Sequence, residues 1–294
     1  SDAVFLRRLM QRRGIAWFFR PGLPEREVAA GSQPKSAIGH TLVLFDDPAC
    51  LRQNEAGSVR FHRDAATEER DAITDWSAER NLQPGRFSVY SPDYRSPAAT
   101  PITTAQSQSR ADQGELGNRL AAGIEEYYVA APHLGDTALD LTALGDVQMA
   151  RFEYVSKSFH GEGGVRDLAV GEWFCLAGHP EIDMHPQKER EFVITEQRIV
   201  AHNNLPVDIS ARVERLFNRN GWKQADDGTP AAGSGERSGY KTRFSCVRRG
   251  VRIVPPRRVL RRPQIQTAIV VGPPGEDVWC DDMGRVKVRF PAAR

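Results

Sequence analysis

Two histidines and two carboxylates lie within the heptapeptide HPEIDMH, which is the most metal-like stretch of the chain. Imidazole and carboxylate groups are common ligands of transition metals. However, Pro180 and Pro186 prevent a helix from presenting both imidazoles on one face. We therefore favour a polar turn here. A metal-dependent hydrolase that uses His179, Asp183 and His185 is kept as an alternative function.

Other motifs for catalysis or phosphate binding do not occur in the sequence. The glycine-rich stretches at 161–164 and 272–275 lack the G-x-x-x-x-G-K-[ST] pattern, and prolines in the second remove N–H donors. There is no G-x-S-x-G nucleophile motif. The cysteines are far apart and lie beside apolar residues: Cys50, Cys175, Cys246 and Cys280. We therefore predict a protein without enzymatic activity, cofactor or bound metal.

Charge is distributed unevenly along the 294 residues, which carry 40 Lys and Arg against 38 Asp and Glu. Residues 237–294 hold 14 basic and 4 acidic residues, a net charge of +10, so residues 1–236 carry −8. Ten of these bases precede residue 263, which raises the alternative of a nucleic-acid-binding protein of the oligonucleotide/oligosaccharide-binding (OB) type. Aromatic residues for base stacking are missing between 248 and 274, so we predict no nucleic-acid partner.

Composition predicts a folded chain, because 40% of the residues are hydrophobic and 27% are charged. No apolar run approaches the roughly 18 residues that a membrane-spanning helix needs. The elements that position the residues above follow from periodicity and turn signals. Helices are predicted at 2–13, 115–128 and 147–159. Strands are predicted at 15–19, 40–46, 58–62, 73–82, 86–90, 172–177, 191–202 and 240–247.

Turn and loop signals connect these elements. Gln83-Pro84-Gly85 is expected to join the strands at 73–82 and 86–90 into a hairpin, and residues 96–113 are expected to be an exposed loop. A connector rich in Pro and Arg runs over 248–263. After it, short strands are predicted at 265–271, 277–280 and 285–290. Three strands cannot bury a core alone, and the first helix lacks a preceding partner, so we expect missing portions at both ends.

The C-terminal segment carries a resemblance to a known family. Residues 266–278 (QTAIVVGPPGEDV) and 281–290 (DDMGRVKVRF) resemble the start of the OB-type barrel of VgrG proteins, the spikes of bacterial type VI secretion systems. Two upstream stretches also agree, FLRRL with GIAWFF and LAVGEWFCLAGH. The motif positions to which the resemblance gives structural roles are Gly14, Gly171, His179, Gly272, Pro274, Gly275, Asp281, Gly284, Arg285 and Lys287.

This resemblance implies a fold that is mainly β with α+β elements. It implies small barrels like those of phage tail hubs with flanking helices, followed by the first strands of an OB-type barrel. The expected domains are a hub-like, tube-docking region at 1–247, the connector at 248–263, and the beginning of the barrel at 264–294.

The resemblance also implies partners. VgrG proteins form homotrimers that dock on the hexameric tube protein Hcp, carry a PAAR-repeat tip protein and effectors, and contact the baseplate. The expected location is the bacterial cytoplasm during assembly, then the medium or a target cell, with transient penetration of the envelope and no membrane span. We further expect four connector arginines to contact acidic groups of a neighbouring subunit: Arg257, Arg258, Arg261 and Arg262.

Overall fold

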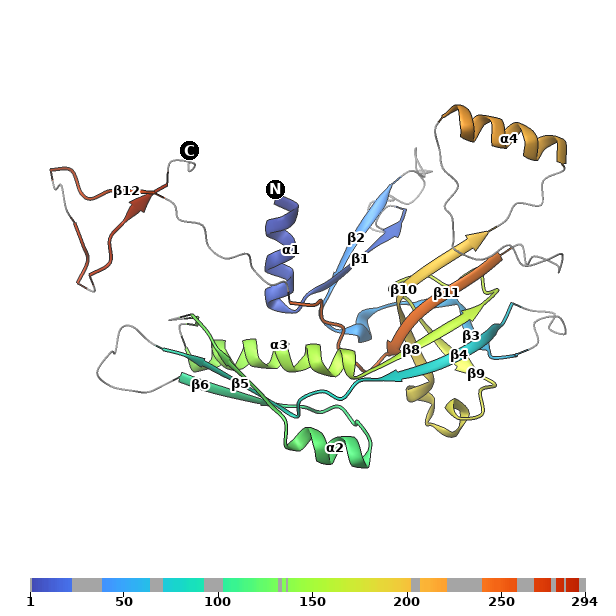
Figure 1. Ribbon diagram of the computed structural model, residues 1–294, viewed down its shortest axis with the longest axis horizontal. Helices are drawn as coiled ribbons and strands as arrows, with labels where there is room; N and C mark the ends of the chain where they lie inside the picture. Colours follow the sequence, from blue (N-terminus) through green and yellow to red (C-terminus); the bar gives the residue numbers. More distant parts are fainter. Residues whose placement is uncertain are drawn as a thin grey trace, which may run out of the picture.

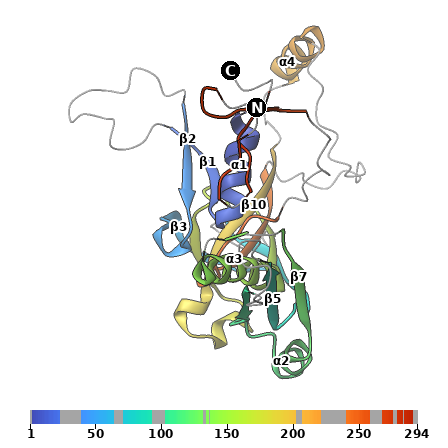
Figure 2. The ribbon, with the colours of Figure 1, turned by 90° about the vertical axis from the view of Figure 1, so that its left-hand side faces the viewer.

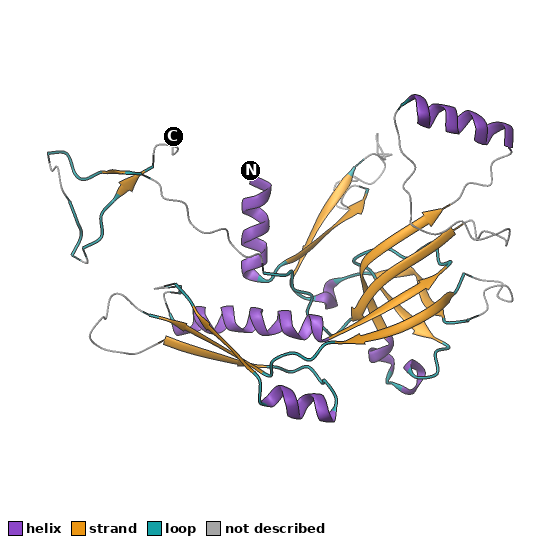
Figure 3. Cartoon of the chain, in the orientation of Figure 1, coloured by secondary structure: helices purple, strands orange, loops and turns teal. Residues whose placement is uncertain are grey.

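The structure is a computed structural model that describes residues 2–22, 39–63, 71–92, 103–131, 134–135, 137–201, 207–220, 240–257, 267–275, 279–282 and 284–290. The chain is mainly β with flanking helices, as the sequence predicts (Figures 1 and 3). Within these ranges, no helix is long and apolar enough to cross a membrane.

The larger module is a curled six-stranded sheet (Figure 3). Its interior is apolar. In spatial order its strands are β3 (Gln53–Arg60), β9 (Trp173–Ala177), β10 (Glu191–Ala201), β11 (Tyr240–Arg248), β8 (Lys157–Gly163) and β4 (Ile73–Arg80). Neighbouring strands are antiparallel except for the parallel pair β3 and β9. A parallel bridge between Phe61 and Ile73 joins the two outer strands, so the sheet closes into a barrel at that end.

Aromatic side chains fill the barrel. The ring of Trp76 lies between 4.9 and 6.4 Å from those of four phenylalanines, measured between centroids: Phe159, Phe174, Phe192 and Phe244. Successive strand residues point to opposite faces, so the same strands place charged side chains on the outside of the barrel. The alternation therefore explains both the apolar interior and the charged outer surface.

A second sheet has three strands and is covered by a helix on one face (Figure 1). Its spatial order is β6 (Thr103–Gln108), β5 (Arg86–Ser91) and β7 (Glu125–Val129), and the helices are α2 (Glu115–Ala122) and α3 (Ala138–Ser156). Strand β5 is antiparallel to β6 and parallel to β7. Helix α2 lies in the connection between the two outer strands, β6 and β7. Phe87 and Val89 of β5 are buried against Leu141 and Met149 of α3.

Helix α3 begins with a capping box and ends directly in the barrel. The Thr137 hydroxyl accepts a hydrogen bond from the Asp140 N–H, and the Asp140 carboxylate accepts one from the Thr137 N–H. The helix ends at Ser156, and β8 begins at Lys157. One continuous segment therefore links the three-stranded sheet to the barrel.

The N-terminal residues form a helix and a hairpin that rise from one side of the two sheets (Figure 2). These are α1 (Asp2–Arg13), β1 (Ala16–Pro21) and β2 (His40–Phe45), with β1 antiparallel to β2. Ala16 and Phe45 at the base are buried against Val193 of the barrel. Further out, Phe19 is 66% exposed and Leu44 is 53% exposed, so one face of the hairpin is apolar and open.

The remaining elements are short or lie outside the two main sheets. They are helix α4 (Val207–Arg219), the two-residue strands β12 (Ile269–Val270) and β13 (Val288–Arg289), and 3-10 helices at Pro48–Cys50, Ile182–Met184 and Gln187–Arg190. Strands β12 and β13 pair with each other. The strand predicted at 277–280 is wrong for residues 279–280, which are not in a strand, and 276–278 lie outside the described residues.

Four other local predictions are corrected by the structure. Strands β4 and β5 do not form a hairpin, because β4 pairs with β8 while the Gly85 N–H donates to Ala121 and draws β5 into the other sheet. The segment expected to be a loop contains β6, which pairs with β5. The helix expected at 115–128 ends at Ala122, and β7 follows Gly123. The helix expected at 147–159 begins nine residues earlier, at Ala138, and ends at Ser156.

Candidate functional site

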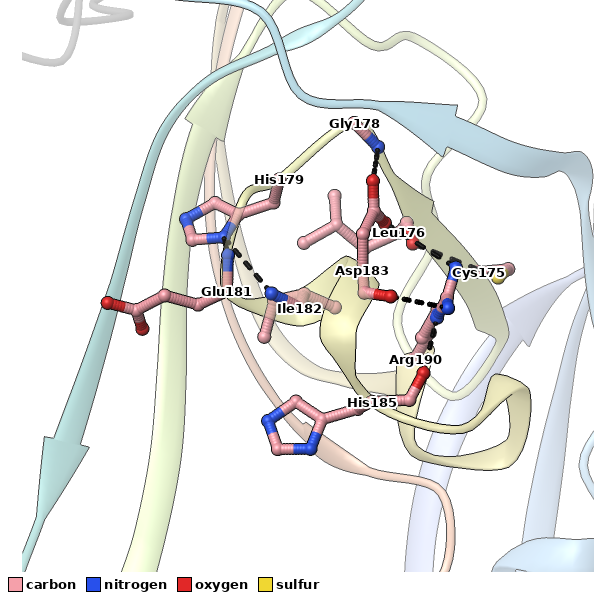
Figure 4. Close-up of polar contacts among 9 residues, drawn as sticks. All are labelled: Cys175, Leu176, Gly178, His179, Glu181, Ile182, Asp183, His185 and Arg190. Carbon is pink, nitrogen blue, oxygen red and sulfur yellow. Dashed lines mark hydrogen bonds and ion pairs between the residues drawn. The ribbon is translucent and has the colours of Figure 1, made fainter.

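The loop that carries the metal-like residues follows β9 and is built from tight turns (Figure 4). Nδ1 of His179 accepts hydrogen bonds from the N–H groups of Glu181, at 3.2 Å, and Ile182, at 3.4 Å. Oδ2 of Asp183 accepts a hydrogen bond from the Gly178 N–H at 2.9 Å. Each of these polar side chains therefore holds its own turn in place.

Arg190 fixes the other side of the same loop. It donates to the carbonyl oxygens of Asp183, at 2.6 Å, and His185, at 2.8 Å. Nδ1 of His185 lies 3.3 Å from a carboxylate oxygen of Glu189. Among the residues that the structure describes, no group of three or more His, Cys, Asp or Glu is arranged to hold a metal ion. The loop gives no support to the metal-dependent hydrolase.

A row of polar side chains crosses the outer face of the barrel, beside a hollow of about 340 Å³. Nδ1 of His160 lies 3.1 Å from the Ser245 hydroxyl, and Nε2 lies 3.2 Å from a Glu79 carboxylate oxygen. The row has the residue types of a serine-hydrolase triad. Ser245 lies inside β11, whose backbone pairs with β8 and β10, so neighbouring N–H groups are not directed outward to stabilise an oxyanion.

Two motif glycines are required by close packing. Gly14 ends α1 with φ of +70°, and a Cβ added there would lie 3.0 Å from Val147. Gly171 has φ of +81°, and a Cβ added there would lie 2.4 Å from the ring of Phe18. Only glycine adopts such a conformation without strain, and only glycine leaves room for that ring. Their expected importance in the family pattern thus has a steric basis here.

The C-terminal motif forms a turn between short paired segments. Asp281 accepts hydrogen bonds from the Arg285 N–H, at 2.9 Å, and from Arg285 Nε, at 2.6 Å. Gly284 has φ of +73° and donates its N–H to the Asp281 carbonyl oxygen. The Val271 N–H donates to the Lys287 carbonyl oxygen at 2.8 Å. The other motif positions are exposed residues of the preceding turn: Gly272, Pro274 and Gly275.

The described residues of the connector, 248–257, contact α3 and β7. Val254 is 1% exposed and packs with Val147 of α3. Arg151 of α3 donates from Nε to the Pro255 carbonyl oxygen at 3.0 Å and from Nη2 to the carbonyl oxygen of Gln11 in α1. One guanidinium thus joins the last turn of α1, the middle of α3 and the connector.

Arg257 anchors the connector further along. Its Nη2 donates to the Tyr128 hydroxyl at 2.6 Å, and its guanidinium carbon lies 4.3 Å from the centroid of the Tyr128 ring. This is a cation–π contact, which at an exposed site contributes about 0.5–1 kcal/mol to stability. The other three arginines expected to face a neighbouring subunit, Arg258, Arg261 and Arg262, lie outside the described residues.

An apolar cavity of about 300 Å³ lies beside this seat. It is bounded by the hairpin, β10, α3 and the connector, with Trp17, Phe18, Val193 and Pro256 among its walls. Tyr154 also lines it, and burial raises the pKa of this phenol, so the ring stays uncharged near neutral pH. The cavity is therefore a neutral, apolar surface at the junction of hub and connector.

Sequence reasoning missed Arg151 as a functional residue, although a signal was available. Helical periodicity places Arg151 on the same face as Val147 and Phe152, so a charged residue occupies an otherwise apolar stripe. Such a residue usually has a specific partner. That partner is the backbone of α1 and of the connector, which lie far from α3 in the sequence.

Small β modules, a clamped connector and an open apolar hairpin face are typical of a protein that works by assembly with other chains. A family model described as the phage tail baseplate hub (GPD) matches residues 1–205. Because this match spans more than half of the 294 residues, the chain belongs to the phage tail baseplate hub (GPD) family.

Relatives agree with this assignment and confirm the resemblance to VgrG proteins. The chain is 40% identical to the type VI secretion system spike protein VgrG4b of Pseudomonas aeruginosa, over 99% of this chain and 31% of that protein. It is 26% identical to VgrG1a of the same organism, over 97% of this chain and 37% of that protein. The chain thus spans about one third of the length of these curated relatives.

Among solved structures, the chain is similar to a tail protein from Neisseria meningitidis MC58, with a TM-score of 0.41 and 10% sequence identity. The alignment covers 72% of this chain and 48% of that one.

Proposed function

We propose that this chain is a structural part of a type VI secretion spike, forming the hub that docks on the tube and the connector that leads into the spike. The observation that carries this proposal is the extent of the similarity. The hub family model covers 1–205, and the spike relatives match along at least 97% of the chain, which includes the connector. In this role the chain acts by binding other subunits, without making or breaking covalent bonds.

The proposed assembly is a homotrimer that binds the Hcp hexamer on one side and, through the complete spike, a PAAR-repeat tip protein and effectors. It would form in the bacterial cytoplasm on the baseplate and then leave the cell. The open apolar face of the β1–β2 hairpin supports this, since a large exposed apolar surface commonly marks a subunit contact. The OB-type barrel after the connector belongs to the same proposal.

The connector arginines Arg257, Arg258, Arg261 and Arg262 are proposed to face acidic groups of a neighbouring subunit. Arg257 stacks on Tyr128 at 4.3 Å, which leaves its charge without a carboxylate partner among the described residues. Three converging copies would bring like charges together and would need such neutralisation.

The proposed function is tested by measuring the release of Hcp into the culture medium. Five spike relatives come from a single organism, so one genome can carry several spike genes. The reading frame that contains this chain is therefore deleted in a strain that lacks its other spike genes. We expect Hcp release to stop and to return when the wild-type frame is restored. Continued release without any spike gene would overturn the proposal.

A further inference from the structure

The arginines at the end of β11 and after it differ in the partners they find. Arg248 donates to the Glu189 carboxylate at 2.6 Å, and Arg249 donates to the Glu191 carboxylate at 2.9 Å. Beyond them, Arg252 and Arg257 form no ion pair among the described residues. The acidic groups that neutralise the connector therefore stop at its first turn.

Arg252 lacks hydrogen-bond partners altogether within the described part of the chain. Its Nε atom is buried and unpaired, although the residue as a whole is only half-buried. Its Nη2 atom lies 3.3 Å from the Cβ position at Gly14, so its guanidinium is held against the end of α1. A buried N–H group without an acceptor is costly, and an arriving anion that accepts its hydrogen bond would relieve this cost.

Arg151 brings a third guanidinium to the end of α1, where its Nη2 donates to the Gln11 carbonyl oxygen. Its acceptors are two backbone carbonyls and the side-chain oxygen of Gln148, so none of them carries a charge. Burial, together with the charges of Arg257 and Arg252, lowers the pKa of Arg151 to about 10. Repulsion within the group is thus present and is not offset by a carboxylate of the described residues.

Separate elements hold the three groups in position. Arg151 comes from α3, Arg252 from the start of the connector, and Arg257 lies against Tyr128 of β7. The burial of Val254 between Arg252 and Arg257 fixes the connector on α3. The guanidiniums are therefore pre-organised, which lowers the entropic cost of binding an anion.

We propose that Arg151, Arg252 and Arg257, named here the arginine triad, bind carboxylates of an acidic segment from a second copy of this chain. This inference rests on the proposed trimeric function. Guanidinium groups form strong, directional hydrogen bonds to carboxylates. The required charge is available in every copy, because residues 1–236 carry a net charge of −8. Assembly thereby neutralises a charge excess that one copy leaves unpaired.

The test measures self-association of the full-length chain by sedimentation. The test variant carries Arg252→Gln and Arg257→Gln and keeps Arg151, which also holds the backbone of the connector. The matched control carries Arg80→Gln and Arg198→Gln, two exposed arginines of the barrel, and so loses the same charge. Thermal unfolding of each variant verifies that the hub is folded.

We expect the dissociation constant of the test variant to rise roughly tenfold or more at low salt, and that of the control to change by less than about twofold. The double variant Arg252→Lys and Arg257→Lys keeps both charges but loses the guanidinium geometry, so it should weaken association less than the test variant does. The difference between test and control should shrink at high salt.

Equal weakening in the test and control variants would mean that only net charge matters, and it would overturn the proposal. Unchanged association of the test variant would overturn it as well, together with the proposed subunit contact of Arg257. It would leave Hcp release and the proposed role as a spike component intact. Inorganic phosphate is the competing ligand. If phosphate binds the wild-type chain and not the test variant, while association is the same in both, the triad is a phosphate site instead.

Discussion

Replacing Gly171 by alanine tests whether the turn before β9 is fixed by the ring of Phe18. Two costs add at this position. The φ of +81° is unfavourable for any residue with a Cβ, by about 1–2 kcal/mol. In addition, the new methyl group would lie 2.4 Å from ring carbons of Phe18, and such overpacking costs about 1–3 kcal/mol. We expect a total loss of about 2–5 kcal/mol in the free energy of unfolding.

Urea unfolding followed by circular dichroism measures this loss as a shift in the midpoint. Two control variants separate the two costs. Gly57→Ala has φ of +61° with its nearest neighbour 3.9 Å away, so it should lose only the conformational part. Gly164→Ala has neither a positive φ nor a neighbour within 4 Å, so it should change stability by less than about 1 kcal/mol.

The steric cost of the new methyl group can also be removed by a second substitution. In a Phe18→Ala background the ring is absent, and the further cost of Gly171→Ala should fall to about 1–2 kcal/mol. The reasoning is refuted if Gly171→Ala costs no more than Gly57→Ala. It is equally refuted if its cost is the same with and without the ring of Phe18.

Two further predictions concern ionisable groups of the barrel. Burial raises the pKa of Glu162, but hydrogen bonds and charges from Lys241 and Arg243 outweigh burial and hold the pKa below 4.5. The ionised carboxylate therefore stabilises the fold above about pH 4.5. This stabilisation is lost as the pH falls through the lowered pKa. Glu162→Gln should accordingly lower the urea midpoint at neutral pH, and this difference should shrink as the pH falls below 4.5. A difference that stays constant as the pH falls contradicts this. Burial also raises the pKa of the Cys246 thiol well above 9. A thiol reagent should therefore label exposed Cys50 in the native protein and leave Cys246 unlabelled until urea is added. Labelling of Cys246 in the native protein would contradict its burial.

Elements with strong local patterns were predictable from the sequence. Helix α1 is bounded by Asp2 and the left-handed Gly14, and the strand patterns of β10 and β11 are nearly alternating, so each element lies within a few residues of its prediction. The partners of the strands were not predictable in the same way. The turn at Gly85 has a hairpin signature, yet its N–H bonds to residues near 121–124, and this long-range contact decides the pairing.

The same division applies to the candidate sites. The prolines around the metal-like loop predict turns, and the structure contains turns held by His179 and Asp183. The seat of the connector could not be derived in this way. Arg151 and Pro255 are separated by more than one hundred residues, and no local sequence feature of either residue indicates that they are in contact. Only the packing of Val254 on α3 brings them together.

The direct passage from α3 into β8 has a mechanical consequence. Nineteen helical residues form a rod about 28 Å long, and this rod becomes a barrel strand without an intervening loop at Ser156 and Lys157. Strand β8 is paired on both sides, with β4 and β11. A force applied to the three-stranded sheet along the axis of α3 therefore acts as shear on the β8–β4 and β8–β11 strand pairings at once. These pairings separate only if many hydrogen bonds break together. Under axial load the two sheets should move as one stiff body.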